Sequence, residues 1–161
     1  MSSNIRNTII FGFITFLLQL LLSEWMSIQG IRPDFVAIFI VYMALTWGSF
    51  YAVWVGFFLG ILVDLLGAGD TFGISSIFYV IIGYFTGYVP RRTHNFPPIY
   101  FHLGWILAFF IAVLINAWFQ YPILFATSKW SFLSKSLFIA SYTLGFIGLI
   151  QFIIPLRRRS D

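Results

Sequence analysis

The segment that decides the fold is GFFLGILVDLLGAGD, residues 56–70. Its apolar composition is typical of a helix in lipid, but Asp64 lies inside the apolar run. Gly56, Gly60 and Asp64 follow one another at four-residue intervals, so on a helix they lie along one face. The fold must therefore explain why a membrane helix has an acidic side chain and two positions without side chains on the same face.

The glycine spacing predicts helix–helix packing. No hydrophobic force draws helices together in lipid, so close backbone approach at small residues supplies much of the packing. Gly83 and Gly87, in GYFTG, repeat the spacing of Gly56 and Gly60 one apolar segment later. We interpret both pairs as contact surfaces, within the fold or, as the alternative, with another protein.

The composition indicates an integral membrane protein. The 161 residues are 60% hydrophobic and 9% charged, whereas charged residues make up about 25% of a soluble globular chain. The length predicts a single domain, residues 1–161. The chain contains no cysteine, which excludes disulfides, thiol nucleophiles and Cys-ligated metals. The net charge of +4 comes mostly from clusters at segment ends, which favours a role in membrane orientation over nucleic-acid binding.

The apolar runs predict an all-α, polytopic fold, because a segment in lipid must satisfy its own backbone hydrogen bonds. A spanning helix needs about 20 apolar residues. The apolar runs cover residues 8–22, 35–66, 74–89, 99–119 and 132–155. As one helix, residues 35–66 would be about 48 Å long, which is too long for one span and tight for two. A break at WGS, residues 47–49, gives six transmembrane helices, and no break gives five.

The basic residues favour six helices with both termini in the cytoplasm. Arg6 is the only charge preceding the first apolar run, which usually weighs most in orientation. With the N-terminus inside, the inner side also holds Arg91, Arg92 and residues 157–159, RRR. The five-helix alternative has an equally basic inner side but leaves Arg6 outside. No cleavage site follows the first run, so we predict an uncleaved helix rather than a signal peptide.

Four of the five acidic residues gather at the outer face of this topology. They are Glu24, Asp34, Asp64 and Asp70, with Arg32 as the nearby cation. A charge within a span usually faces protein or water. We interpret Asp64 as a helix-end contact with a neighbouring backbone or with Arg32, with a partner or ligand contact and catalysis as the alternatives.

Motifs for chemistry are mostly absent, so we predict no enzyme activity, no metal and no cofactor. His94 and His102 do not have the spacing of a metal-ligand pair, and no serine–histidine–acid set can be argued. GAGDTFG lacks the Gly-Lys-Ser/Thr of a nucleotide-binding loop, and its glycines fit a tight turn. Further polar side chains in or beside the spans are typical of cross-helix hydrogen bonds. They are Gln19, Asn116, Gln120 and Gln151.

Three stretches together resemble the MreD family of rod-shape-determining proteins. RPDFVAIFIVYMALTWG, residues 32–48, resembles the family's Pro-Asp-led second helix, and GFFLGILVDLL resembles its Gly-x-x-x-Gly-x-x-x-Asp helix. FGIS and IIGYFTGYVPRR resemble its Leu-Gly turn, Gly-Tyr-x-x-Gly helix and basic loop, with Phe72 where leucine is common. The specific resemblance covers residues 32–92, and the last two helices match only in hydropathy. From the resemblance and the spacing, we expect helix packing or partner contact at Pro33, Asp34, Gly56, Gly60, Asp64, Gly73, Gly83, Tyr84 and Gly87.

The resemblance implies a function that composition does not. MreD proteins are non-enzymatic subunits of the bacterial elongation machinery (the elongasome) in the cytoplasmic, or inner, membrane, where they bind the bitopic protein MreC. The pair acts in peptidoglycan synthesis with the MreB filament, a lipid II glycosyltransferase and a class B penicillin-binding transpeptidase. The family's fold is similar to the substrate-binding subunit of energy-coupling-factor transporters.

Three functional hypotheses follow. The first is a membrane scaffold of the cell-elongation complex that binds MreC and membrane lipid. The second is a vitamin-binding membrane subunit of a transporter, which predicts an outward-facing pocket and a separate energising subunit. The third is an intramembrane lipid enzyme. It needs a pair of acidic residues deep within the membrane, and only Asp64 is near such a position.

Overall fold

The computed structural model describes residues 2–28, 30–66, 72–88 and 98–153. The described residues form seven helices and no β-strand, so the predicted all-α class is confirmed. The helices are α1 (Ser2–Leu22), α2 (Phe35–Trp47), α3 (Ser49–Leu66), α4 (Ile74–Tyr88), α5 (Pro98–Gln120), α6 (Pro122–Thr127) and α7 (Lys129–Ile153).

Gly48 divides the long apolar run into two helices. It has φ +102° and ψ 168°, a backbone conformation that is essentially restricted to glycine. Its N–H donates to the carbonyl of Ala44, and its own carbonyl accepts from the N–H of Ala52, so both helix ends are hydrogen-bonded at the joint. The predicted break at residues 47–49 is confirmed, and a single helix over residues 35–66 is excluded.

Substitution of Gly48 by alanine is expected to lower the free energy of unfolding by about 1–3 kcal/mol, because a Cβ atom strains the backbone at this φ and ψ. The measurement is thermal unfolding of the purified protein in detergent, followed by tryptophan fluorescence. Gly145→Ala in α7 is the matched control, because an added Cβ there meets nothing within 4 Å. Equal melting temperatures for both variants would contradict the strain at Gly48.

Six of the described helices are apolar. Three are long enough to cross a membrane by length and composition, namely Ser49–Leu66, Ile99–Gln120 and Lys129–Gln151. The three shorter apolar helices cover Arg6–Leu22, Phe35–Trp47 and Ile74–Tyr88. They correspond in order to the six apolar segments expected from the sequence.

The segment between the last two long apolar helices contains a short helix, α6. The following helix, α7, begins at Lys129, three residues before the predicted apolar run of residues 132–155. Pro122 is tolerated at the first turn of α6 because its missing N–H would have no intrahelical partner there. Ser128 precedes α7, and its Oγ accepts from the N–H of Ser131 at 3.3 Å, which starts the helix earlier.

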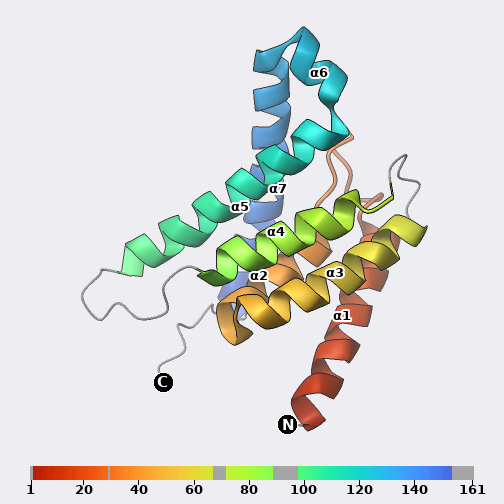
Figure 1. The fold of residues 1–161 in the computed structure, drawn as a ribbon, viewed down its shortest axis with the longest axis vertical. Coiled ribbons are helices and arrows are strands. Elements are labelled where there is room, and N and C mark those ends of the chain that lie inside the picture. Colours follow the sequence, from red (N-terminus) through yellow and green to blue (C-terminus); the bar gives the residue numbers. More distant parts are fainter. Residues whose placement is uncertain (1, 29, 67–71, 89–97, 154–161) are drawn as a thin grey trace.

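The centre of the fold is α2, which is apolar on all sides and mostly buried, as expected for a helix surrounded by protein. It contacts α1, α3, α4 and α7. Figure 1 shows α3 and α4 side by side in front of α2, with α1 on one flank and α5 along α4. The hairpin of α5 and α7 carries α6 at its tip, at the top of the view in Figure 1.

Candidate functional site

The two glycine motifs pack α3 against α4 at backbone distance. A Cβ atom at Gly56 would lie 2.9 Å from the carbonyl oxygen of Tyr79, and one at Gly60 would lie 2.3 Å from the Cα of Ser76. Both distances are shorter than real Cβ contacts, and the neighbouring atoms belong to the backbone. Glycine is therefore the residue that fits at both positions.

The second motif makes the reciprocal contact. A Cβ atom at Gly83 would lie 2.9 Å from the carbonyl carbon of Ala52, and one at Gly87 would lie 2.5 Å from the Cα of Ser49. The residue numbers of the contacts decrease along α3 as they increase along α4, so the two helices are antiparallel. The helix faces that carry the glycines pack against each other. We call these four glycines and their contacts the glycine interlock. It lies within the fold, and it leaves no space between α3 and α4 for another helix.

Asp64 hydrogen-bonds the start of the neighbouring helix. Its Oδ2 accepts from the N–H of Gly73 at 2.8 Å, and its Oδ1 accepts from the N–H of Ser75 at 3.3 Å. The first N–H groups of a helix have no intrahelical partner, and a carboxylate near them is also favoured by the helix dipole. Gly73 supplies the turn with φ +97°. Arg32 is bonded elsewhere, since its Nη1 lies 3.0 Å from Oε1 of Glu24.

Substitution of Asp64 by alanine is expected to lower stability by about 0.5–2 kcal/mol, the usual effect of removing a helix cap. Asp64→Asn should lose less, because its amide oxygen still accepts one of the two bonds. Thermal unfolding in detergent measures both. Glu24→Ala is the control: it removes an exposed ion pair, whose contribution is about 0–1 kcal/mol. The assignment fails if the alanine and asparagine variants both melt like the wild type.

Asp34 joins α2 to α4. Its Oδ1 accepts from the N–H of Ala37 at 2.8 Å and so caps α2. The hydroxyl of Tyr79 donates to the same carboxylate, 3.0 Å from Oδ1 and 3.1 Å from Oδ2. Burial raises the pKa of the Asp34 carboxyl to about 6, because removal from water disfavours the charge more than these hydrogen bonds favour it.

Two further helices bind the start of α2. Gln19 of α1 accepts from the N–H of Phe35 through its Oε1 at 2.8 Å, and Thr143 of α7 accepts from the N–H of Asp34 through its Oγ1 at 3.4 Å. Pro33 is fully buried beside them. We call Gln19, Asp34, Tyr79 and Thr143 the polar junction. It ties α1, α2, α4 and α7 together, and sequence reasoning did not identify Tyr79 or Thr143 as members.

Eight of the nine predicted site residues therefore fall into three groups. The interlock holds Gly56, Gly60, Gly83 and Gly87. The contact between the end of α3 and the start of α4 holds Asp64 and Gly73, and the polar junction holds Asp34 next to Pro33. Tyr84 lies apart from all three. Its side chain is 52% exposed and its ring stacks on Tyr88 at 6.2 Å.

Other residues singled out in the sequence lie elsewhere. His102 is in α5, where its Nδ1 accepts from Nε1 of Trp105 at 3.2 Å. Within the described ranges, no three His, Asp or Glu side chains come close enough to hold a metal ion. Asp70, His94, Arg91, Arg92 and residues 154–161 lie outside the described residues.

These features define a class of protein: a multi-pass helical membrane protein whose polar and glycine residues fix helix against helix. The chain matches the family of the rod shape-determining protein MreD over residues 3–157, and it therefore belongs to the MreD family. The predicted resemblance is thus confirmed. No curated protein and no solved structure matches the chain, so the likeness to a transporter subunit stays a prediction.

Membership in the family fixes the general role. The chain is a rod-shape-determining membrane protein of the bacterial inner membrane, with several apolar helices. The family belongs to the system that determines cell shape, and it is not a known enzyme family.

Proposed function

We propose that this chain is a non-enzymatic scaffold subunit of the bacterial cell-elongation complex and that it binds MreC. The observation that carries the proposal is the family match over residues 3–157, nearly the whole chain. The MreB filament, a lipid II glycosyltransferase and a class B penicillin-binding transpeptidase are the further members of the proposed assembly. Membrane lipid surrounds it.

The proposed topology has six spans and both termini in the cytoplasm. Arg6 before the first apolar helix supports this orientation. The end of α1 and the start of α2 then lie on the outer side, together with the end of α3 and the start of α4. The polar junction and the hydrogen bonds of Asp64 to Gly73 and Ser75 join these helix ends to one another. They would form the outer end of the bundle, next to the extracytoplasmic part of a bitopic partner.

The proposed mechanism is to hold a partner in a fixed position. Backbone contacts in the glycine interlock leave α3 and α4 little freedom to slide, because interfaces packed at this distance transmit strain rather than deform. The polar junction fixes three more helices to this pair. A rigid bundle of this kind is suited to a scaffold. Its lipid-facing helix surfaces keep constant positions, which a partner's single helix can bind.

Depletion of this chain from its own bacterium tests the proposal. We expect cells to stop elongating and to become wider or round, because the peptidoglycan synthases lose their common membrane scaffold. Microscopy and incorporation of a fluorescent cell-wall precursor measure the effect, and re-expression of the wild-type chain is the control. Unchanged width and elongation rate after complete depletion would count against the proposed function.

A further inference from the structure

The turn of the hairpin between α5 and α7 extends past the rest of the bundle. In Figure 1, α6 and the first turns of α7 lie at the top of the view, at the opposite end from the N-terminus. The connector from α1 to α2 meets α7 much further along that helix. The hydroxyl of Tyr142 donates to the carbonyl of Met26 at 2.7 Å, and Oγ1 of Thr143 accepts from the N–H of Asp34. Residues 129–141 of α7 therefore extend beyond this contact.

Exposed charges indicate which part of the bundle lies in lipid. Arg6 is exposed near the start of α1. In the connector after α1, the exposed carboxylate of Glu24 pairs with Arg32. A charge that faces the hydrocarbon core is costly, so these residues lie at its edges or outside it. The 18 positions from residue 6 to residue 24 correspond to about 27 Å of helix, close to the core thickness of about 30 Å. The outer edge of the core therefore lies near Glu24.

This edge crosses α7 near Phe138. Gln19 of α1 and Thr143 of α7 both hydrogen-bond the start of α2, so they lie at a similar depth. Glu24 follows Gln19 by five positions, which places it about 7 Å further out. Because α7 runs in the opposite direction, the same rise leads from Thr143 to Phe138. Phe138 is exposed and apolar, as expected next to lipid, and the polar side chains of KWSFLSK, residues 129–135, come just beyond it.

The first turns of α7 are therefore outside the lipid. Residues 129–137 extend about 14 Å beyond the edge of the core, whereas the headgroup layer adds only about 5–8 Å on each side. An average helix tilt of about 20° shortens this distance only slightly. We call residues 121–137, which include α6, the hairpin tip. Ile123 and Trp130 are 78% and 80% exposed at its outer part.

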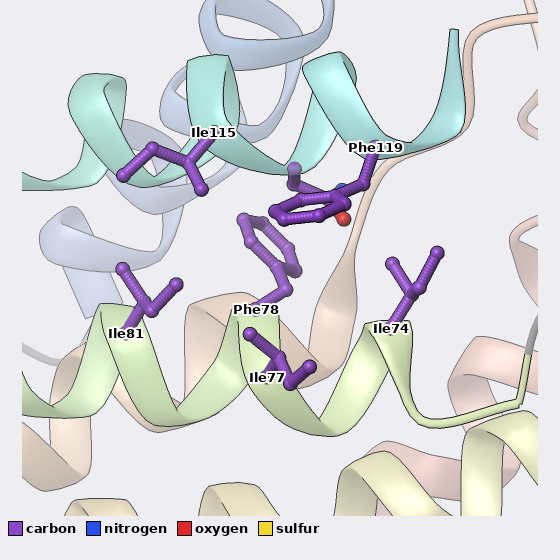
Figure 2. A pocket seen from close by; sticks show the side chains of 7 residues that line it. Ile74, Ile77, Phe78, Ile81, Ile115 and Phe119 are labelled. Atoms are coloured by element: carbon purple, nitrogen blue, oxygen red, sulfur yellow. The ribbon is translucent and has the colours of Figure 1, made fainter. Parts of the chain in front are cut away.

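Lipid covers other apolar surfaces of the bundle but not this one. A crevice between α4 and α5 lies beside the spans, at the depth of the polar junction, where acyl chains of lipid suffice to cover it (Figure 2). Its walls are Ile74, Ile77, Phe78, Ile81, Ile115, Asn116 and Phe119. The exposed apolar side chains of the hairpin tip face water instead. Such side chains in water mark contact surfaces for proteins, and tryptophan is enriched among the residues that contribute most to binding.

Ring contacts hold the hairpin tip in one shape. The ring of Phe125 in α6 packs edge-on against that of Phe132 in α7, with 5.1 Å between the centroids. Nζ of Lys135 lies 3.8 Å from the centre of the Tyr121 ring, a cation–π contact between the two ends of the tip. Phe132 is buried. The tip is therefore an ordered surface.

The charge of the hairpin tip indicates the kind of partner. Its charged residues are Lys129 and Lys135, and no acidic residue occurs between Asp70 and Asp161. The tip is thus basic without acidic neighbours in the sequence, and it complements an acidic surface. A partner with its own membrane helix is held close to the outer membrane surface, where its effective concentration at the tip is high.

We propose that the hairpin tip binds the extracytoplasmic segment of the bitopic partner that directly follows its transmembrane helix. Apolar side chains of that segment cover Ile123 and Trp130, and acidic side chains pair with Lys129 and Lys135. The proposal rests on the proposed function above, including its orientation. It goes further by naming a contact outside the lipid and the chemistry that recognises the partner.

Labelling of single cysteines tests the position of the hairpin tip, since the chain has no cysteine of its own. Cysteine replaces Ile123 or Trp130 in the full chain, expressed in a host without its MreC, and intact spheroplasts receive a charged, membrane-impermeant maleimide. Phe58 in α3 and Leu107 in α5 are matched control positions, exposed and apolar in the middle of their helices. We expect the tip to react at least about tenfold faster, because lipid excludes the charged reagent. Equal protection at all four positions would overturn the proposal.

Photo-crosslinking identifies the occupant. p-Benzoylphenylalanine is placed at Trp130 of the full chain, which is co-expressed with MreC and irradiated in intact membranes. We expect an adduct of one chain with one MreC, and the crosslinked MreC peptide should lie just after its transmembrane helix. Trp25, which is 92% exposed in the connector after α1, is the matched control position and should give no such adduct.

Two variants test the chemistry. Trp130→Ala is expected to reduce co-purified MreC at least about tenfold, the effect of a dominant interface residue. Lys129→Glu should reduce it about threefold, and less at high salt, because it opposes an acidic partner. The controls are Trp25→Ala and Ser27→Glu, which make the same kinds of change in the connector after α1. Gel filtration and the melting temperature of each variant establish that the bundle is intact.

The outcomes separate this inference from the proposed function. If MreC co-purifies equally with the wild-type chain and with both tip variants, the tip is not a binding surface and the proposed function stands. Crosslinks from Trp130 to lipid alone, to a second copy of this chain or to the transmembrane helix of MreC overturn the proposed occupant. If MreC does not co-purify with the wild-type chain at all, the proposed function itself fails.

Discussion

Replacement of Gly60 by leucine is expected to prevent accumulation of folded protein in the membrane. A Cβ atom at this position would lie 2.3 Å from the Cα of Ser76, so even a methyl group overlaps the backbone of α4. Overpacking a core usually lowers the free energy of unfolding by about 1–3 kcal/mol, because neighbouring side chains can move aside. Here the obstacle is the backbone of a helix, so α3 and α4 must separate along the interlock.

The measurement is fluorescence-detected gel filtration of detergent extracts, with the melting temperature of any folded fraction. Gly148→Leu in α7 is the matched control, because an added Cβ there meets nothing within 4 Å. Gly12→Ala in α1 is a milder control, since its Cβ would make an ordinary contact at 3.5 Å with Phe39. A Gly60→Leu protein that elutes and melts like the wild type would show that α3 and α4 are not packed through this glycine.

Replacement of Asp34 by alanine is expected to lower the free energy of unfolding by about 2–4 kcal/mol. Loss of a helix cap contributes about 0.5–2 kcal/mol. The hydroxyl of Tyr79, which is 2% exposed as a residue, is left without its acceptor, and a buried unsatisfied donor costs about 1–3 kcal/mol. The effect should exceed that of Asp64→Ala, in which no buried side chain loses its partner.

A double-mutant cycle with Tyr79→Phe isolates the Asp34–Tyr79 contact. In the phenylalanine background no hydroxyl is left unpaired, so Asp34→Ala should cost less there, with a coupling of about 0.5–3 kcal/mol. Unfolding in increasing denaturant gives the four free energies. Glu24→Ala is the control for loss of an acidic side chain at an exposed position. Strictly additive effects of the two substitutions would mean that the hydroxyl and the carboxylate do not interact in the folded protein.

Local patterns predicted the features that depend on neighbours in the chain. The Gly and Ser of WGS indicated the break between α2 and α3, and the structure explains it by the positive φ of Gly48. The four-residue spacing of Gly56 and Gly60 indicated a helix face without side chains at these positions, on which another helix can pack. Such patterns suffice because helix geometry alone places residues four apart on one side.

Long-range pairing could not be predicted in the same way. Asp34 and Tyr79 are 45 residues apart in the chain, and Asp34 and Thr143 are 109 apart. No spacing rule connects them, because their contact depends on how whole helices pack. Likewise, the glycine spacing did not show that Gly56 and Gly60 pack on Tyr79 and Ser76 of α4, nor that the α4 glycines pack on α3 in return. Tyr84 is 52% exposed although it follows the packed Gly83, since adjacent helical positions point in different directions, and its expected role in packing or partner contact stays a prediction.

The sequence contains an N-cap signal at the start of α7 that the prediction did not use. Ser128 is followed three residues later by Ser131, whose N–H it accepts, and serine is a preferred N-cap residue. The prediction for this helix used the apolar run of residues 132–155, which begins after Ser128 and Ser131. Helix boundaries depend on such single hydrogen bonds and are therefore less certain than the apolar segments themselves.

Quantitative mass spectrometry of the chain purified from its native membrane in mild detergent tests the scaffold function most directly. We predict that MreC accompanies the wild-type chain in equimolar amount, with the other members of the elongation complex at lower yield. Gly60→Leu should bring down none of them, and Gly148→Leu should match the wild type. A pair of ATP-binding subunits and a bound small molecule in place of MreC would contradict the scaffold function and identify the chain as a transporter subunit.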